Sequence, residues 1–88
     1  MLEIERTNQF KKDYKLARRR SKRLEHIESV VDSLARQQLL HARHQPHKLT
    51  GDLEGYWECH VEPDYLLLYG YAGGRLVLVR PGTHSDLF

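Results

Sequence analysis

Four residues in the second half of the chain could carry acid–base chemistry together. Three are the histidines His47, His60 and His84, and the fourth is the acid Asp64. The pKa of an ordinary histidine lies near neutrality, so an imidazole can take or give a proton at physiological pH. Arg80, four residues before His84, adds a planar cation suited to a phosphate group. A base, an acid and a phosphate-binding cation are what cleavage of RNA through its 2′-hydroxyl requires.

Three apolar stretches after residue 55 predict the strands that position these residues. They alternate or are apolar throughout, and short turn sequences separate them. The second stretch is apolar on both faces, as in the centre of a sheet. We therefore expect an antiparallel meander of three strands, at residues 56–61, 65–72 and 75–80, with turns at 62–64 and 73–74.

The directions of these strands predict which candidate residues meet. A strand of six residues spans about 20 Å, so its two ends are far apart. The third strand returns to the edge where the second begins, and His60, Asp64, Arg80 and His84 should therefore share one region. His47 lies in the loop that enters the first meander strand from its opposite end. Its membership of the group stays open on geometry alone.

The first half of the chain predicts one short strand and two helices. Residues 2–7 alternate, and Thr7 or Asn8 can cap the helix that follows. Apolar residues at helical spacing predict this helix over about 8–20, and a second helix from a possible cap at Ser21 to about residue 40. A short connection makes the two an antiparallel hairpin.

These elements together predict an α+β fold. An N-terminal strand and the helix hairpin precede the meander, and the helices pack on one face of the sheet. The intervening residues 41–55 have the composition of a loop, with Pro46, Gly51 and Gly55.

Length and composition bound the kind of protein. The chain has 88 residues, of which 40% are hydrophobic and 30% charged, and a formal net charge of +2. These values predict a single domain at residues 1–88 with a modest core. No apolar run approaches the ~20 residues of a membrane helix, residues 1–10 lack the long apolar stretch of a signal peptide, and Cys59 is the one cysteine. We therefore expect a cytoplasmic protein.

Positive charge is concentrated in the predicted helical region. Eight of the fourteen lysines and arginines fall between residues 11 and 23, against one acid, Asp13. Such a run is often a solvated helix face, but it could also bind a sugar–phosphate backbone without reading its sequence. The eight residues are Lys11, Lys12, Lys15, Arg18, Arg19, Arg20, Lys22 and Arg23.

Aromatic residues near the meander could hold an unstacked base. Tyr56, Trp57 and Tyr65 are the candidates. Tyr56 and Trp57 alternate across their strand, so we expect one of them to lie in the core.

Two further patterns predict less than their residue types suggest. His41, His44 and His47 are spaced by three, but Pro46 interrupts any helix there and no nearby Cys or acid completes a ligand set, so we predict no metal site. Cys59 precedes His60 directly, and adjacent strand residues point to opposite faces. Cys59 is therefore expected to be a small buried residue rather than a nucleophile.

Two stretches of the sequence resemble one known family. The segment HVEPDYLLLY (60–69), followed by R-x-G-T-H-S-D-L-F (80–88), closely resembles the YafQ branch of the RelE-like toxins. These are the toxin halves of bacterial type II toxin–antitoxin pairs. The resemblance covers essentially the whole chain. It implies a ribosome-dependent endoribonuclease, or mRNA interferase, that cuts mRNA in the A site without metal or other cofactor and so inhibits translation and growth.

The resemblance also implies roles for individual residues. It places the catalytic group on His47, His60, Asp64 and His84, with Phe88 in support, so that His47 joins the others. His84 would be the general acid at the leaving 5′-oxygen, and Asp64 or His60 the base at the 2′-hydroxyl. His47 would orient the phosphate or stabilise its charge.

The resemblance implies partners as well. They are a cognate antitoxin of the DinJ or RelB kind, mRNA and rRNA on the ribosome, and operator DNA reached only through the antitoxin complex, with no membrane. Tyr65 stands where this branch usually has Trp, and Pro81 where Thr is usual. The alternative hypothesis is therefore a catalytically attenuated homologue that acts mainly as an antitoxin- or rRNA-binding module. A free-standing nucleic-acid-binding domain would leave His84 without a purpose.

Overall fold

The computed structural model describes residues 1–20 and 24–88. Ser21, expected to cap the second helix, and the basic residues Lys22 and Arg23 lie outside the described residues. In chain order the strands and helices are β1 (Glu3–Arg6), α1 (Asn8–Arg19), α2 (Leu24–Ala35), β2 (His47–Lys48), β3 (Trp57–Glu62), β4 (Tyr65–Ala72), β5 (Arg75–Gly82) and α3 (His84–Leu87), with 3₁₀ turns at Ala42–His44 and Gly51–Leu53.

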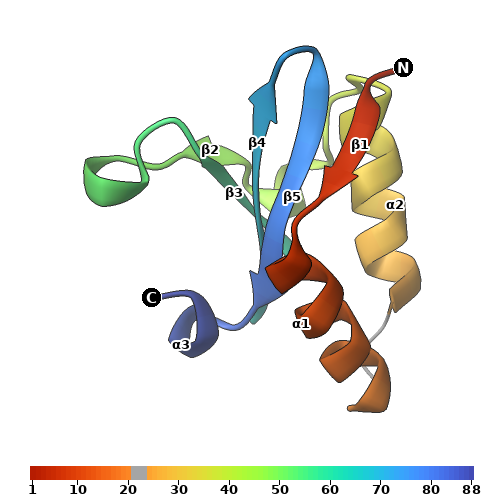
Figure 1. The fold of residues 1–88 in the computed structure, drawn as a ribbon, viewed down its shortest axis with the longest axis vertical. Helices are drawn as coiled ribbons and strands as arrows, with labels where there is room; N and C mark the ends of the chain where they lie inside the picture. Colours follow the sequence, from red (N-terminus) through yellow and green to blue (C-terminus); the bar gives the residue numbers. More distant parts are fainter. Residues whose placement is uncertain (21–23) are drawn as a thin grey trace.

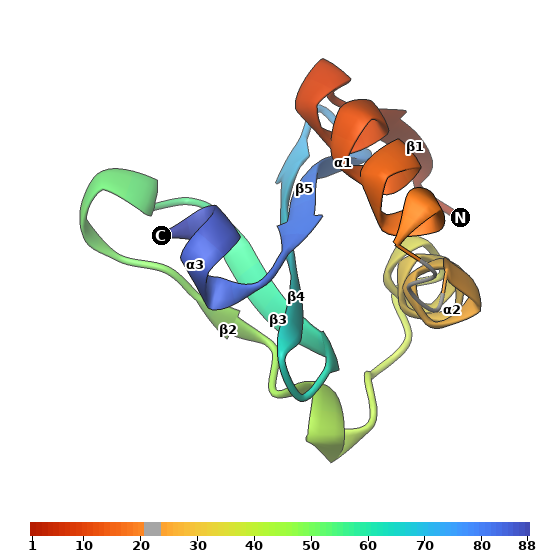
Figure 2. The same ribbon diagram turned by 90° about the horizontal axis from the view of Figure 1, so that it is seen from below.

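The strands form one mixed sheet in the order β1-β5-β4-β3-β2. β1 pairs in parallel with β5, and every other pair is antiparallel. Helices α1 and α2 run in opposite directions on one side of the sheet (Figure 1), and α3 lies on the other (Figure 2). The predicted α+β fold, with the two-helix hairpin on one face, is therefore confirmed.

The core lies between the sheet and the two long helices. Alternate residues of β4, namely Tyr65, Leu67 and Tyr69, pack there with buried residues of α1 and α2. Leu66 and Leu68 are also buried, but they lie outside this core because they point to the opposite face. β4 is thus covered on both sides, as its apolar sequence predicted.

Local hydrogen bonds join the first helix to the sheet. The Oγ1 atom of Thr7 accepts the N–H of Phe10 at 3.0 Å and so caps α1. The same hydroxyl donates to the carbonyl of Val79 at 2.6 Å. One side chain therefore starts the helix and fixes its beginning against β5.

The second helix is shorter than its sequence pattern predicted. It ends at Ala35 rather than near residue 40, because Gln37 adopts a left-handed conformation with φ 58°. The N–H of Gln37 donates to Leu34 and that of Gln38 to Ser33, which is the hydrogen-bond pattern of a Schellman cap. Glycine usually occupies such a position, so the sequence carried no stop signal.

The end of the chain also differs from the expected turn. Pro81 and Gly82 continue β5 opposite Leu67 and Leu66, after a bulge at Val79. β1 pairs with β5 only as far as Leu78, so Pro81 lies where β5 has no second neighbour and a missing N–H is tolerated.

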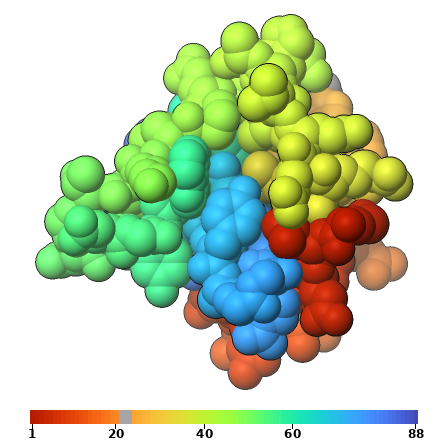
Figure 3. Space-filling model, turned by 90° about the horizontal axis from the view of Figure 1, so that it is seen from above, coloured from red at the N-terminus to blue at the C-terminus, as the bar shows by residue number. Residues whose placement is uncertain are grey.

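Seen from above, the light-blue end of the β4–β5 hairpin lies between the red N-terminal strand and the green segment around residue 50 (Figure 3). The hairpin turn is Gly73–Gly74, and both glycines have positive φ, as a tight two-residue turn requires.

Within residues 1–20 and 24–88, no helix is both long and apolar enough to cross a bilayer.

Candidate active site

The face of the sheet opposite α1 and α2, here called the open face, brings two of the predicted histidines together. His47 on β2 pairs with Glu58 on β3, and Glu58 pairs with Leu68 on β4. His60, two residues further along β3, pairs with Leu66. Paired and alternate residues share a face, so His47, Glu58 and His60 project on the side of Leu66 and Leu68.

The register corrects the expected position of His47. The sequence left this residue at the far end of the first meander strand, because residues 41–55 were taken as loop. Instead β2 runs antiparallel along the edge of β3 and carries His47 back to Glu58. A two-residue strand has too short a pattern to be predicted from sequence.

Both ring nitrogens of His47 face oxygen atoms. Nδ1 lies 3.0 Å from the carbonyl oxygen of Gln45, and Nε2 lies 3.4 Å from Oε1 of Glu58. The carbonyl can only accept, so Nδ1 carries a proton and donates it. The two contacts fix the orientation of the His47 ring on the open face.

Glu58 is the functional candidate that the sequence missed. Its side chain is 4% exposed, and Oε2 is buried without a hydrogen bond to the described residues. A buried carboxylate needs a compensating partner, and His47 is the partner it has. The sequence feature that could have indicated Glu58 is its place between Trp57 and Cys59 in a predicted strand.

His60 and Asp64 lie at the two ends of the β3–β4 turn. Nδ1 of His60 lies 3.1 Å from the carbonyl oxygen of Pro63, so this nitrogen carries a proton and donates it. In the neutral ring, Nε2 is then free to accept a proton. Asp64 is exposed, and its carboxylate makes no hydrogen bond or ion pair to the described residues.

A short helix carries His84 to the same end of the sheet. Leu66, which pairs with His60, also pairs with Gly82, two residues before His84. Thr83 caps α3 in a capping box: its N–H donates to Asp86 Oδ2 at 3.1 Å, and its Oγ1 accepts the N–H of Asp86 at 3.3 Å. These hydrogen bonds hold the pKa of the Asp86 carboxyl below its usual range.

Contacts of α3 with the sheet and with its own end orient His84. A Cβ built on Gly82 would lie 2.9 Å from Cβ of Asp86 and 3.3 Å from Cδ2 of Leu87, so only glycine lets α3 approach so closely. The rings of His84 and Phe88 have centroids 5.7 Å apart at 44°. Phe88 thus flanks the predicted acid, and its own ring is 57% exposed.

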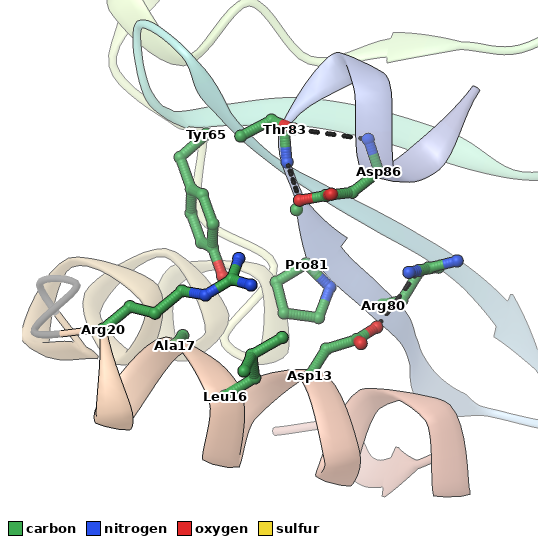
Figure 4. A pocket seen from close by; sticks show the side chains of 10 residues that line it. Asp13, Leu16, Ala17, Arg20, Tyr65, Arg80, Pro81, Thr83 and Asp86 are labelled. Carbon is green, nitrogen blue, oxygen red and sulfur yellow. Dashed lines mark hydrogen bonds and ion pairs between the residues drawn. The ribbon is translucent and has the colours of Figure 1, made fainter.

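Arg80 is one of the residues that line a pocket between α1 and the end of β5. This pocket, of about 330 Å³, is walled by α1 on one side and by Pro81, Thr83 and Asp86 on the other (Figure 4). Arg80 Nε lies 3.1 Å from Oδ2 of Asp13 on α1, close enough for an ion pair although not aligned as a hydrogen bond. Arg80 is therefore tied to α1 by an ion pair, while its strand position pairs with Leu68.

The three aromatic candidates lie in different places. Tyr65 is 7% exposed in the helix-facing core, where burial, followed by the charge of Asp13, raises its pKa to about 12. Trp57 stacks on Tyr69 with ring centroids 6.4 Å apart, and Lys48 Nζ lies 5.6 Å from its ring. Tyr56 is 40% exposed. The expectation that one of the pair Tyr56 and Trp57 packs against the core is met by Trp57.

The basic residues on α1 face solvent. Among the residues that the structure describes, they form an exposed cationic side of the helix, distinct from its buried residues Phe10 and Ala17. The five on α1 are Lys11, Lys12, Lys15, Arg18 and Arg19; Arg20, the C-cap of α1, is also exposed and lines the pocket beside Tyr65.

Cys59 is a buried core residue, as predicted. It is 0% exposed, and burial, together with the charge of Glu58, raises the pKa of its thiol to about 12. Such a thiol is not a nucleophile at neutral pH.

The histidines spaced by three, His41, His44 and His47, each have their own contacts. The Nδ1 atom of His44 is bonded to the carbonyl of His60, and the Nδ1 atom of His41 accepts the N–H of Arg43. Across the described ranges, no three or more His, Cys, Asp or Glu side chains are grouped to hold a metal ion.

The fold and this histidine-bearing face place the protein among the toxins of bacterial type II toxin–antitoxin systems. Residues 2–88 match the family described as "Bacterial toxin of type II toxin-antitoxin system, YafQ". The chain therefore belongs to the YafQ family, as its sequence resemblance predicted.

Individual relatives agree in sequence and structure. The mRNA interferase toxin YafQ of Escherichia coli strain K12 is 38% identical over 87 residues, which cover 98% of this chain and 95% of the relative. The E. coli DinJ–YafQ toxin–antitoxin complex contains a chain with TM-score 0.90 and 36% identity, covering 99% of this chain and 97% of that one. A metal-bound toxin from Helicobacter pylori has TM-score 0.94 and 40% identity over the full length of both chains. The predicted class of enzyme, an endoribonuclease, agrees with the name mRNA interferase.

Proposed function

We propose that this chain is a ribosome-dependent mRNA interferase that acts in the cytoplasm and is neutralised by a DinJ-like antitoxin. It cleaves mRNA in the A site through attack of a ribose 2′-hydroxyl on the adjoining phosphate. The products are a 2′,3′-cyclic or 3′-phosphate and a 5′-hydroxyl. The observation that carries the proposal is the strand register, which brings His47 and His60 to the open face, next to the turn that holds Asp64 and the end of β5 that leads to His84.

The hydrogen bonds of the histidines support a division of roles. His60 donates from Nδ1 to a carbonyl, which leaves Nε2 to take the proton of the 2′-hydroxyl. Asp64 lies in the turn between β3 and β4 and makes no hydrogen bond or ion pair to the described residues. It is the other candidate base. His47 is held between the carbonyl of Gln45 and the buried Glu58, which suits a group that orients the phosphate or stabilises its charge.

The general acid in this scheme is His84. Its ring makes no hydrogen bond to the described residues, so a proton on it is available to the leaving 5′-oxygen. α3 is fixed at its first turn by the capping box, and Phe88 flanks the imidazole. Phe88 is therefore a supporting residue. Proton transfers of this kind are each worth about 10²–10⁴-fold in rate.

Arg80 and the basic side of α1 complete the proposal. In the RNA-bound state Arg80 would exchange Asp13 for a phosphate, since the ion pair is only part-buried and is not aligned as a hydrogen bond. The exposed lysines and arginines of α1 would hold rRNA by salt-dependent contacts. The metal-bound state of the H. pylori relative is a property of that protein; the acid–base scheme here needs no metal.

The alternative function is an attenuated homologue that serves mainly to bind its antitoxin or rRNA. Its motivation is Pro81 and Tyr65, which differ from the usual residues of this branch. Pro81 lies at an unpaired edge of β5 and Tyr65 lies in the core, so neither change reaches the histidines directly. The geometry therefore favours the catalytic function.

The test compares the wild-type chain with His84→Ala, each induced without antitoxin. Wild type should arrest growth and produce ribosome-dependent 5′ ends on a reporter mRNA, and His84→Ala should reduce these cuts by about 10²–10⁴-fold. His41→Ala is the matched control, because His41 is exposed and its Nδ1 atom bonds within its own turn, to the N–H of Arg43. Equal arrest by wild type and His84→Ala, or no cuts from either, would reject the catalytic function in favour of the binding module.

Metal independence has its own measurement. Toxin treated with EDTA and then returned to ribosome buffer containing Mg²⁺ should cleave at the untreated rate. A loss of activity that is restored by Cu²⁺ or Zn²⁺ would contradict the metal-free mechanism.

A further inference from the structure

Tyr56 is the aromatic residue of the sheet whose ring covers the open face. Its neighbour Trp57 and the buried Tyr65 both belong to the helix-facing side. The ring of Tyr56 instead lies over Gly70 of β4. Gly70 follows Tyr69, a core residue, so its Cβ direction is that of Leu66 and Leu68 on the open face.

Gly70 allows this ring to lie close against the sheet. A Cβ built on Gly70 would come within 3.3 Å of Cδ1 and 3.8 Å of Cε1 of Tyr56. One side of the ring is therefore supported by β4, while the residue as a whole stays 40% exposed. Its hydroxyl makes no hydrogen bond to the described residues, so the ring has no evident structural task at its outer end.

The ring of Tyr56 lies two strand residues away from the position of His47 and Glu58. Leu68, two residues before Gly70, pairs with Glu58, which pairs with His47. Two residues of a strand span about 7 Å, so the Tyr56 position adjoins the His47–Glu58 position on the same face. A base attached to a nucleotide next to a phosphate held at His47 can reach the ring.

We infer that Tyr56 is the stacking platform for the base of the nucleotide next to the scissile phosphate. The inference rests on the proposed function and adds the residue that sets the position of the RNA. Stacking on an aromatic ring tolerates any base, because every base has a π-face. The contact is present before and during the reaction, so it should lower KM and leave kcat unchanged.

The experiment measures cleavage of a short synthetic mRNA in the A site of purified ribosomes, with toxin in excess. Tyr56→Ala should raise the half-saturating toxin concentration by about 5-fold to 150-fold without changing the maximal rate. Tyr56→Phe keeps the ring and should behave as wild type. The matched control is Tyr71→Ala, which removes an equally exposed tyrosine at the far end of β4, on the helix-facing side.

An abasic nucleotide next to the cleavage site tests the partner of the ring. With wild type it should weaken binding as much as Tyr56→Ala does, and combining the two changes should weaken binding no further. Additive losses would show that the base lies elsewhere and would overturn the inference. So would a Tyr56→Ala protein with an unchanged half-saturating concentration.

Two further outcomes separate this inference from its foundation. If wild type cuts no mRNA, the proposed function fails and the platform with it. If wild type cuts and only the platform tests fail, the proposed function stands alone. Should Tyr56→Ala melt well below wild type, the abasic substrate with the wild-type protein decides: no loss of binding overturns the inference.

Discussion

The helix-covered face and the open face of the sheet use the same strands for different purposes, and β4 shows the contrast. Tyr65, Leu67 and Tyr69 point toward α1 and α2, where apolar volume fills the core. Leu66 and Leu68 point the other way and lie beside His60 and Glu58. One face is held by packing, while the other holds polar groups at defined atoms: a carbonyl for His60, and a carbonyl with a buried carboxylate for His47.

This contrast indicates that stability and activity are separable in so small a domain. A core position tolerates any side chain of similar shape, because dispersion and burial are not directional. The open face depends on hydrogen-bond donors and acceptors, which a small change of side chain abolishes. Substitutions on the two faces should therefore produce different experimental signatures.

Leu67→Ala, a change on the helix-covered face, should lower the unfolding free energy more than any other substitution considered. Leu67 is 0% exposed in the core, and such truncations cost about 2–5 kcal/mol of unfolding free energy. Urea unfolding followed by circular dichroism measures the loss, with the fully exposed Leu39→Ala as control. Activity per folded molecule should be retained. A destabilisation below about 1 kcal/mol would mean that this face is not the principal core.

Glu58→Gln should separate the two signatures on the open face. The amide keeps the shape but removes the charge opposite His47, so cleavage should fall by about ten-fold or more, the value of one hydrogen bond between charged groups. Unfolding free energy should stay constant or rise, since a buried carboxylate with an unsatisfied oxygen is costly.

The controls for this change are an exposed acid and a double mutant. Glu54→Gln should alter neither quantity, because Glu54 is exposed. Glu58→Gln combined with His47→Ala should be no less active than His47→Ala alone, if Glu58 acts through His47. A clear drop in stability with full activity would assign Glu58 a purely structural role.

The sequence predicted the helix-covered face better than the open face, for a physical reason. Periodicity reports burial, so the alternation of β3, the apolar run of β4 and the stripes of α1 and α2 were all visible. Thr7 and the Gly73–Gly74 turn carried their own local signals.

The missing parts depend on contacts between distant segments. β2 is two residues long and exists because β3 offers an edge, so nothing local indicated that His47 returns to Glu58. α3 is a single turn, which Thr83 and Asp86 cap together. The ion pair of Arg80 with Asp13 on α1 joins residues 67 positions apart in the sequence, and no local pattern predicted it. Such pairings are set by the tertiary fold.

Gly82→Ala tests whether the position of α3, which carries His84, matters for cleavage. The added Cβ would meet Asp86 at 2.9 Å, so α3 must move and carry His84 with it. We expect a several-fold loss of cleavage and a cost of about 1–3 kcal/mol, as for other overpacked sites. Ser85→Ala, an exposed change on the same helix, is the control. Wild-type cleavage by Gly82→Ala would show that the placement of α3 is not critical.

Tyr65→Phe should have the smallest effect, measured as a change in how the unfolding free energy depends on pH. Burial raises the pKa of Tyr65 to about 12, above the value near 10 of an unfolded tyrosine. The folded state therefore favours the neutral ring: this contribution to stability is complete below about pH 10 and is lost as pH rises toward 12. At pH 11 the phenylalanine variant should lose about 1 kcal/mol less than wild type, relative to pH 8, in urea unfolding. Leu39→Ala, a change at a fully exposed position, is the control and should keep the pH dependence of wild type. Equal losses of unfolding free energy for wild type and Tyr65→Phe between pH 8 and pH 11 would contradict the buried position of the Tyr65 hydroxyl.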